Sequence, residues 1–399
     1  MWYIIGHVIW YLILVLIILY IVLKAIFKLK FHFWSIQPVF HIYDIHHWLN
    51  PYKLIDPDLP QINKYVNIID IKTKSIEDLS EKEINIFCNF LKEYYLRTKG
   101  MQYLPDVKHV MEYLKASNHS SFISFYTEPK LLFDKEHIIT DKDTLSVISA
   151  RPLHVSLKGM ETFPTYYVDN LCVKPSMRKK GIAPKIIQTL YYDIRRGNDK
   201  IKNCLFKREG EMTAIVPLTT FACKCYDTKS WGNPNEQHAS MQLIEIGDNN
   251  LTLLAEYIFN QKNKLNCVIL PEITNIAKLI KNENISVYGI INNDSLISLY
   301  LFRDSATIYK DDKALDLVGS INSCPTVDIF INGFKTALSR CCKKYDTSLI
   351  LIDELGANNL ISLYANNNNM LLHFESIAAF FFYNYVSYTI PPNECFIFY

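Results

Sequence analysis

Residues 166–184 read Tyr-Tyr-Val-Asp-Asn-Leu-Cys-Val-Lys-Pro-Ser-Met-Arg-Lys-Lys-Gly-Ile-Ala-Pro. Their first part, residues 166–173, is an apolar run of strand length. A basic loop follows and ends at Gly181, after which Ile186, Leu190 and Ile194 recur at helix spacing. Pro184 suits the first helical turn, where its missing N–H costs nothing. The segment predicts a strand, a basic loop and a helix.

This order of elements can hold a phosphate group. The unpaired N–H groups of a first helical turn and the helix dipole both favour an anion. Arg178, Lys179 and Lys180 add positive charge, and Gly181 lets the backbone approach a ligand closely. From the loop alone two interpretations stay open: a cradle for the diphosphate of an acyl-CoA, and a solvated basic turn. The GxGxxG and GxxxxGK(S/T) patterns of nucleotide-binding loops are absent.

The composition narrows the class of protein. Of the 399 residues, 49% are hydrophobic and 21% are charged, which excludes a disordered chain. The net charge of +2 gives no general signal for nucleic acid. Ten cysteines without paired CxxC spacing indicate reduced thiols in a cytosolic compartment. The histidines at 41, 46 and 47 lack a second ligand group at suitable spacing, so no metal site is predicted.

The first residues predict a membrane anchor. Within residues 1–23 only Gly6 and His7 are not apolar. At about 1.5 Å per residue this run reaches roughly 35 Å, enough to cross a hydrocarbon core of about 30 Å. A buried helix is the alternative. Lysines follow at 24, 28 and 30 and nothing basic precedes the run, so the positive-inside rule places the rest of the chain in the cytosol.

The remainder reads as two α/β units. Residues 31–60 lack periodicity and are expected to form an extended arm, and Ser80 begins a helix with a capping-box pattern. Residues 145–150 read as a strand. In the second half we expect a hairpin over residues 286–302, a helix over 328–343 and a strand over 348–352. The two halves share this order of elements loosely, which favours a duplicated unit.

Four segments resemble the N-myristoyltransferase family, whose members are two fused GNAT-like halves. Residues 169–184 resemble its acyl-CoA-binding segment, an outline that general GNAT acetyltransferases share. Three further segments are similar to the family's Phe-Trp-x-Thr-Gln-Pro-Val signature, to its Ile-Ser-Ala-x-Pro strand and to its closing segment: Phe33-Trp-Ser-Ile-Gln-Pro-Val39, Ile148-Ser-Ala-Arg-Pro152, and Phe382-Tyr-Asn-Tyr385 with Ile390-Pro-Pro392. The similarity runs in order over residues 31–399.

The resemblance implies a fold and its division. We expect an α/β (α+β) protein with tandem GNAT-like domains that form one saddle-shaped sheet with flanking helices, preceded by a transmembrane helix. Residues 1–30 would be the anchor and its basic flank. Residues 31–235 would form the acyl-CoA-binding half and residues 236–399 the peptide-binding half.

The resemblance also implies a site. Backbone N–H groups of Asn170 and Leu171 would polarise the thioester carbonyl of myristoyl-CoA, and each such donor is typically worth about 2.7–4 kcal/mol. The terminal carboxylate of Tyr399 would take a proton from the N-terminal glycine ammonium of the acceptor peptide. Asp169 stands where the family has Asn beside that amine, so it could hold the ammonium or act as an auxiliary base. Contacts to the acyl-CoA are expected from Trp34, Gln37, Leu171, Val173, Arg178, Lys179, Lys180, Gly181, Ile182 and Ala183.

Two further departures bear on substrate choice and activity. Leu-Arg-Thr-Lys at residues 96–99 stands where the family has an acidic run, which favours a different peptide preference, such as one for acidic peptides. The family's Thr-Ala-Gly strand, which lines the glycine pocket, has its nearest counterpart in Glu-Met-Thr-Ala at residues 211–214.

These observations predict a single-pass membrane protein, held through residues 1–23, whose cytosolic catalytic domain moves a C14 acyl group. Myristoyl-CoA would be the donor and the N-terminal glycine of protein substrates the acceptor, without a metal or nucleic acid. Two alternatives stay open. One is a catalytically degenerate membrane protein that binds acyl-CoA or peptide, and the other is a GNAT-type N-acyltransferase that uses a shorter acyl-CoA.

Overall fold

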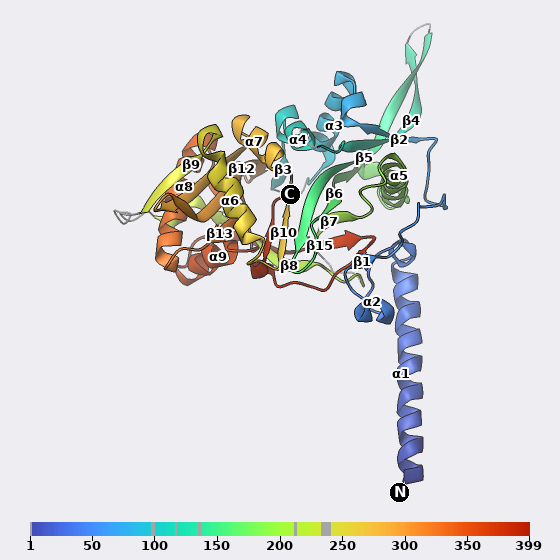
Figure 1. Cartoon of the computed structure of the whole chain (residues 1–399). Coiled ribbons are helices and arrows are strands. Elements are labelled where there is room, and N and C mark those ends of the chain that lie inside the picture. The colour runs from blue at the N-terminus through green and yellow to red at the C-terminus, as the bar shows by residue number, and fades with distance from the viewer. Residues whose placement is uncertain (1, 97–99, 116–117, 135–136, 211–213, 233–240) are drawn as a thin grey trace.

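The computed structural model of the chain describes residues 2–96, 100–115, 118–134, 137–210, 214–232 and 241–399 (Figure 1). Its α-helices are α1 (Trp2–Lys30), α2 (Ile45–Leu49), α3 (Glu81–Tyr94), α4 (Val107–Leu114), α5 (Ile182–Gly197), α6 (Leu251–Gln261), α7 (Ile273–Lys281), α8 (Val327–Tyr345) and α9 (Asn358–Asn367). Short 3-10 turns are η1 (Trp34–Ile36), η2 (Ile76–Asp78), η3 (Pro175–Met177), η4 (Thr228–Trp231), η5 (Asp248–Asn250) and η6 (Pro392–Glu394).

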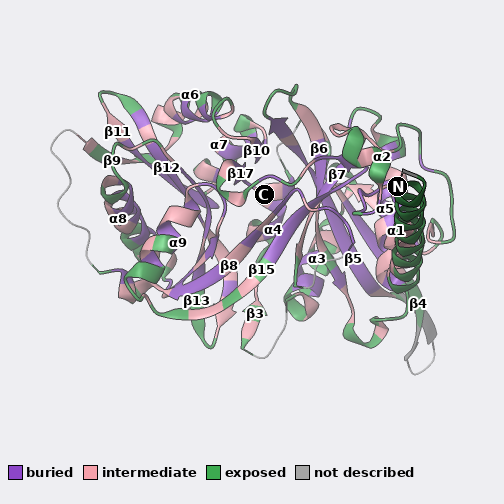
Figure 2. Cartoon of the chain, turned by 90° about the horizontal axis from the view of Figure 1, so that it is seen from below, coloured by how far each residue is buried: buried purple, intermediate pink, exposed green. Residues whose placement is uncertain are grey.

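The strands are β1 (Lys53–Leu54), β2 (Ile71–Ser75), β3 (Met101–Tyr103), β4 (Phe122–Asp134), β5 (His137–Leu157), β6 (Phe163–Val173), β7 (Cys204–Glu209), β8 (Thr219–Asp227), β9 (Met241–Ile246), β10 (Cys267–Leu270), β11 (Ile285–Asn292), β12 (Ser295–Tyr309), β13 (Asp312–Asn322), β14 (Leu349–Asp353), β15 (Leu372–Tyr383), β16 (Tyr385–Val386) and β17 (Cys395–Ile397). All but β1 and β16 belong to one large sheet. Its neighbours run β17-β10-β5-β6-β7-β15-β8-β14-β13-β12-β11-β9, with β4 added to β5, β2 to β4 and β3 to β12. Helices flank this sheet, so the predicted fold class is confirmed (Figures 1 and 2).

The segment of residues 166–184 folds as predicted. β6 and β7 are parallel neighbours, and α5 connects them. A parallel pair needs a crossover of this kind, whereas adjacent antiparallel strands need only a short turn. β6 ends at Val173, α5 begins at Ile182, and Pro184 lies in its first turn.

Apolar faces hold the helices on the sheet. Ile186 and Ile194 of α5 are buried in one cluster with Tyr166 of β6. In the second half, Phe330 and Phe334 of α8 pack on the ring of Tyr300, whose hydroxyl donates to the Phe330 carbonyl at 2.6 Å. Truncating a buried aromatic of this kind typically costs about 3–5 kcal/mol. Figure 2 shows buried residues along the central strands and exposed ones on the outer faces of the helices.

The two predicted halves exchange strands. β15 comes after all the helices α6–α9 of the second half, yet it pairs with β7 as well as with β8. β10 pairs with β5 on one side and with β17 on the other. This interleaving brings the end of the chain to the middle of the molecule (Figures 1 and 2). The predicted boundary at residues 235 and 236 lies outside the described residues, and the division into halves stays a prediction.

Other predicted elements can be checked one by one. Ser80 caps α3 in a capping box with Glu83, and β11 and β12 form the predicted hairpin. α8 and β14 match the predicted helix and strand. Residues 31–60 are less extended than predicted, because η1, α2 and β1 form there. α2 follows a local turn in which the Asp44 carboxylate accepts from the His41 N–H at 3.1 Å, a contact that hydrophobic periodicity does not report.

α1 stands out from the body of the molecule (Figure 1). Its span Tyr3–Lys30 is long and apolar enough to cross a membrane by length and composition, and none of its most apolar 18-residue window is buried. Among the residues that the structure describes, the contacts of α1 with the body come from its last turns. The Tyr20 hydroxyl donates to the Tyr43 carbonyl at 3.1 Å, and the rings of Phe27 and Tyr43 lie 6.1 Å apart.

His109 of α4 links this helix to strand β12. Its Nδ1 lies 2.6 Å from the carboxylate of Asp106, the residue that caps α4, and its Nε2 lies 3.4 Å from the carboxylate of Asp304 on β12. The hydrogen bond to Asp304 raises the pKa of the imidazole and the charge of Asp106 adds to this, although burial opposes both. The folded chain therefore binds this proton more tightly than the unfolded chain does.

We expect His109→Gln to lower the free energy of unfolding by roughly 1 kcal/mol at pH 5.5 and by much less at pH 8.5. A raised pKa stabilises the fold below the unfolded histidine value of about 6.5, and this contribution is lost as the pH rises through the folded value. Melting of the full chain in detergent at several pH values measures the difference. His46→Gln, at an exposed position of α2, controls for the loss of an imidazole. An equal loss of unfolding free energy at both pH values would contradict a stabilising interaction of protonated His109 with Asp106 and Asp304.

Candidate active site

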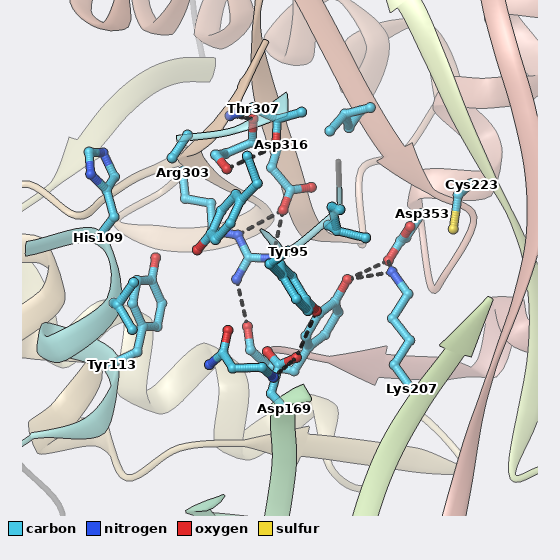
Figure 3. A pocket seen from close by; sticks show the side chains of 18 of the residues that line it. Tyr95, His109, Tyr113, Asp169, Lys207, Cys223, Arg303, Thr307, Asp316 and Asp353 are labelled. Atoms are coloured by element: carbon cyan, nitrogen blue, oxygen red, sulfur yellow. Dashed lines mark hydrogen bonds and ion pairs between the residues drawn. The ribbon is translucent and has the colours of Figure 1, made fainter. Parts of the chain in front are cut away.

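A cavity of about 510 Å³ opens where α4 and β3 face the middle of the large sheet (Figure 3). Its wall includes three predicted site residues, Asp169, Asn170 and Tyr399. The described residues that line it also include Tyr95, Leu96, Met101, Tyr103, His109, Val110, Tyr113, Leu114, Ser149, Arg151, Tyr167, Lys207, Glu209, Cys223, Lys224, Arg303, Asp304, Ser305, Ala306, Thr307, Asp316, Leu351, Asp353, Phe374 and Ser376.

β6 is irregular where it meets the cavity. Asp169 pairs with Ser149 of β5, but the register then shifts, and Asn170 and Leu171 leave the regular ladder. The backbone of Asn170 is left-handed, with φ of 57°. A β-bulge of this kind frees main-chain N–H groups from strand pairing. The two predicted backbone donors therefore lie at a bulge, which the sequence did not indicate.

The first of these donors is already engaged. The Asn170 N–H donates to the carboxylate of its neighbour Asp169 at 2.7 Å. The Tyr95 hydroxyl donates to the same carboxylate oxygen at 3.4 Å, and the Asn170 side-chain amide donates to the Ser149 hydroxyl at 2.9 Å. Leu171 is 37% exposed and does not line the cavity. Asp169 would have to turn away before a second acceptor could use the Asn170 N–H.

Tyr399 reaches the opposite wall of the cavity. Arg303 donates to the backbone oxygen of Tyr399 at 2.8 Å and forms an ion pair with Asp316 at 2.7 Å. The Tyr399 hydroxyl accepts from the Lys207 ammonium at 2.7 Å and donates to the Asp353 carboxylate at 2.8 Å. Lys207 and Asp353 are themselves paired at 2.7 Å (Figure 3). Both ends of the residue are thus fixed by partly buried ion pairs.

The Lys207–Asp353 pair is charged at neutral pH. In the other pair, burial raises the pKa of the Asp316 carboxyl although the charge of Arg303 opposes this. Burial alone would raise the pKa of the Asp353 carboxyl, but the Lys207 ammonium and the hydrogen bonds from Cys223, Lys207 and Tyr399 together lower it. Burial opposes the charge of Lys207 and of Arg303, yet their carboxylate partners raise both pKa values. Burial raises the pKa of the Tyr399 hydroxyl well above 10, so this group acts as a hydrogen-bond donor and acceptor.

The basic loop lies apart from the cavity, at the N-terminus of α5. Arg178 donates to the carbonyls of Val173 and Tyr94 at 3.2 and 3.3 Å, and Lys180 contacts the sulfur of Met177 at 3.7 Å. Arg178, Lys179 and Lys180 are exposed. Gly181 is the N-cap of α5 with φ of 75° and supplies no side-chain bond to the first turn. The structure therefore gathers the predicted phosphate-binding residues at an open helix N-terminus.

The other residues predicted to contact acyl-CoA have mixed environments. Trp34 stacks on Phe206 with ring centroids 5.4 Å apart. Gln37 is buried, and its side-chain oxygen accepts from the Tyr383 hydroxyl at 2.6 Å. Ile182 is buried in the α5 core, and Ala183 follows it in the first helical turn. Gln37 and Ile182 are thus buried residues that pack within the folded protein.

Several charged residues of the cavity were not predicted: Arg151, Lys207, Arg303, Asp316 and Asp353. Most share a signal in the sequence, since a charge interrupts or ends an apolar strand, as at Leu-Asp-Leu (residues 315–317) and Ile-Asp (residues 352–353). Buried charges need partners, so such positions point to a polar cavity. Two predicted features, residues 97–99 of the basic run and 211–213 of the glycine-pocket segment, lie outside the described residues. Across the described ranges, no group of three or more His, Cys, Asp or Glu residues is placed to hold a metal ion.

No family model matches the chain, and no curated protein matches its sequence. Solved structures do match. Saccharomyces cerevisiae N-myristoyltransferase with bound myristoyl-CoA aligns over 90% of this chain and 94% of its own length, with 14% identity and a TM-score of 0.67. Two further structures of that enzyme, one with myristoyl-CoA and one with myristoyl-CoA and inhibitors, each cover 94% of this chain at 14% identity, with TM-scores of 0.68 and 0.67. The chain therefore has the fold of the N-myristoyltransferases along nearly its whole length.

Proposed function

We propose that this chain is a divergent N-myristoyltransferase, which transfers a myristoyl group from myristoyl-CoA to the N-terminal glycine amine of protein substrates. The observation that carries the proposal is that the β6 bulge and Tyr399 meet at one cavity, within a fold that is shared with that enzyme. We also propose that residues 31–235 form the acyl-CoA-binding GNAT-like half and residues 236–399 the peptide-binding half.

In the proposed reaction the acceptor ammonium first gives a proton to the Tyr399 carboxylate. The free amine nitrogen attacks the thioester carbonyl carbon and a C–N bond forms. The C–S bond breaks, and CoA leaves as a thiolate that takes up the second proton of the nitrogen, which leaves a neutral amide and CoA thiol. Main-chain N–H groups of Asn170 and Leu171 would donate to the carbonyl oxygen as negative charge develops there. Asp169 holds the arriving ammonium, and in doing so its carboxylate releases the Asn170 N–H that it now binds.

The basic loop supports acyl-CoA as the donor. Arg178, Lys179 and Lys180 stand exposed around the N-terminus of α5, where helix N–H groups and the dipole favour a phosphate. Leu171 and Val173 would lie along the CoA between this loop and the cavity, with Gly181, Ile182 and Ala183 at the phosphates and Trp34 and Gln37 beside it.

A protein that binds acyl-CoA or peptide without turnover is the second candidate. Two hydrogen bonds favour it: the Asp169 carboxylate accepts from the predicted oxyanion donor Asn170 N–H, and the Arg303 guanidinium donates to the Tyr399 backbone oxygen. Both bonds reduce the capacity of the site to bind an oxyanion and to accept a proton.

We further propose that α1 anchors the protein in a membrane with the rest of the chain in the cytosol. The apolar length of α1 and the lysines at its end support this placement. All ten cysteines lie among the described residues and are unpaired, as is usual for a reducing compartment.

We expect the full chain in detergent to acylate glycine-started peptides with myristoyl-CoA, and to leave peptides with an acetylated N-terminus unmodified. Mass spectrometry of a peptide panel measures the transfer, and acetyl-CoA and palmitoyl-CoA in parallel reactions report the acyl length. Faster transfer from acetyl-CoA would favour the shorter-chain GNAT alternative. Absence of transfer from every donor, with acyl-CoA still bound, would favour the binding protein.

Extending the chain beyond Tyr399 by Gly-Ser-Gly should lower kcat at least about a hundredfold, because the proton acceptor is then replaced by a peptide carbonyl. Affinity for myristoyl-CoA, measured by calorimetry, should change little, since the basic loop is distant from Tyr399. The same extension placed before Met1 is the control. Unchanged turnover in the chain extended at Tyr399 would exclude the Tyr399 carboxylate as the base.

Full-length chain expressed in eukaryotic cells should stay in the membrane pellet after alkaline extraction, whereas a chain that lacks residues 1–30 should become extractable. Asn118, Asn250, Asn284 and Asn293 stand in glycosylation sequons, and we expect none to be glycosylated. Glycan on any of them, detected by a mobility shift that glycosidase reverses, would place the chain on the opposite side of the membrane.

A further inference from the structure

The guanidinium of Arg151 lies in the cavity wall, and no carboxylate in the described part of the chain forms an ion pair with it. It lies on β5, is only 6% exposed and lines the cavity. The rings of Tyr113 and Tyr167 each lie 5.5 Å from it. Ring contacts of this kind cover the faces of a guanidinium, whereas its N–H groups point outward in its plane. No described residue supplies a hydrogen-bond acceptor to those N–H groups.

The other lysines and arginines of the cavity wall differ from Arg151 in this respect. Each has a carboxylate partner at 2.7 Å among the described residues: Lys207 with Asp353, Lys224 with Glu354, and Arg303 with Asp316. Burying a charge is costly unless it is paired. An isolated guanidinium in this wall is thus poised to receive an anion from outside the chain.

The lowered pKa of Arg151 agrees with a buried positive charge that nearby groups offset only in part. Burial lowers it, and the Tyr167 hydroxyl and the Asp169 carboxylate offset this only in part, while the charge of Arg303 lowers it further. Asp169 thus contributes a favourable field, but no hydrogen bond joins the two side chains among those the structure describes.

Asp169 is the acidic counterpart of Arg151, a carboxylate in the same cavity wall. Its carboxylate accepts from the Tyr95 hydroxyl and the Asn170 N–H, and no lysine or arginine among the described residues forms an ion pair with it. On the sheet Asp169 faces Ser149, and Tyr167 faces Arg151, so the acid and the base are offset by two residues, about 7 Å along the strands. The wall therefore presents a carboxylate and a guanidinium at the spacing of neighbouring groups in a short peptide.

We propose that Arg151 binds the carboxylate of an acidic side chain that closely follows the N-terminal glycine of the acceptor, while Asp169 holds the glycine ammonium. The assignment of the ammonium rests on the proposed function. With Cα atoms 3.8 Å apart in successive residues, the acidic side chain of the second residue spans the offset best. A planar carboxylate matches the forked N–H edge of a guanidinium, which makes the acceptor class acidic.

The test compares binding of matched peptides to the full chain in detergent. Pairs of glycine-started peptides carry Asp or Asn, or Glu or Gln, at position 2, 3 or 4, and calorimetry measures their affinity with and without saturating CoA. The wild-type chain should bind the acidic member of at least one pair about ten- to a hundredfold more tightly, the range expected for a charged hydrogen bond. Arg151→Met should abolish that ratio, and Arg151→Lys should retain part of it.

Arg340→Met, at an exposed position of α8, is the matched control and should keep the wild-type ratio. Equal affinity of the wild-type chain for both members of every pair would overturn the proposal, and so would an unchanged ratio in Arg151→Met. A merely structural role for Arg151 would weaken acidic and amide peptides alike. Binding does not require transfer, so an acid preference in a chain without turnover would refute the proposed reaction and leave this inference standing.

Discussion

The pairing of β15 with β7 is the constraint on which the rest of the structure depends. It carries the end of the chain out of the second half and back across the sheet, from Ala378 opposite Glu209 to Tyr383 opposite Cys204. The last strand, β17, then lies beside β10. Because strand pairing fixes register to the residue, Tyr399 has one position to occupy, and that position is the wall of the cavity.

The ion pairs around Tyr399 follow from the same constraint. Once the end of the chain is inside, its polar groups need partners, and Arg303 and Lys207 supply them from different strands. Removing one member of these partly buried pairs would leave the charge of the other without its partner. The geometry of the wall is therefore stiff on the side of Tyr399. Around Asp169, where hydrogen bonds come from Tyr95 and from Asn170, less has to break for a ligand to enter.

The sequence predicted the elements that depend on near neighbours, such as β6, the basic loop and α5, because capping and hydrophobic periodicity act within a few residues. It did not predict the cavity wall. Arg303 lies 96 positions from Tyr399, and Lys207 lies 146 positions from Asp353, so only the order of strands brings them together. The family resemblance pointed to Tyr399 and to the backbone donors Asn170 and Leu171, but not to the bulge on which these donors lie. The engagement of the Asn170 N–H depends on a side-chain rotation that no pattern encodes.

The contact between Tyr20 and Tyr43 limits how much of α1 can lie within a membrane. Residues that touch the folded body cannot also sit in hydrocarbon, so the free part of α1 ends near Leu19. From Trp2 to that point the helix is about 27 Å long at about 1.5 Å per residue, close to the thickness of a bilayer core. A protein anchored in this way would rest on the lipid surface without a tether, and the product of the proposed acyl transfer would emerge within reach of the leaflet.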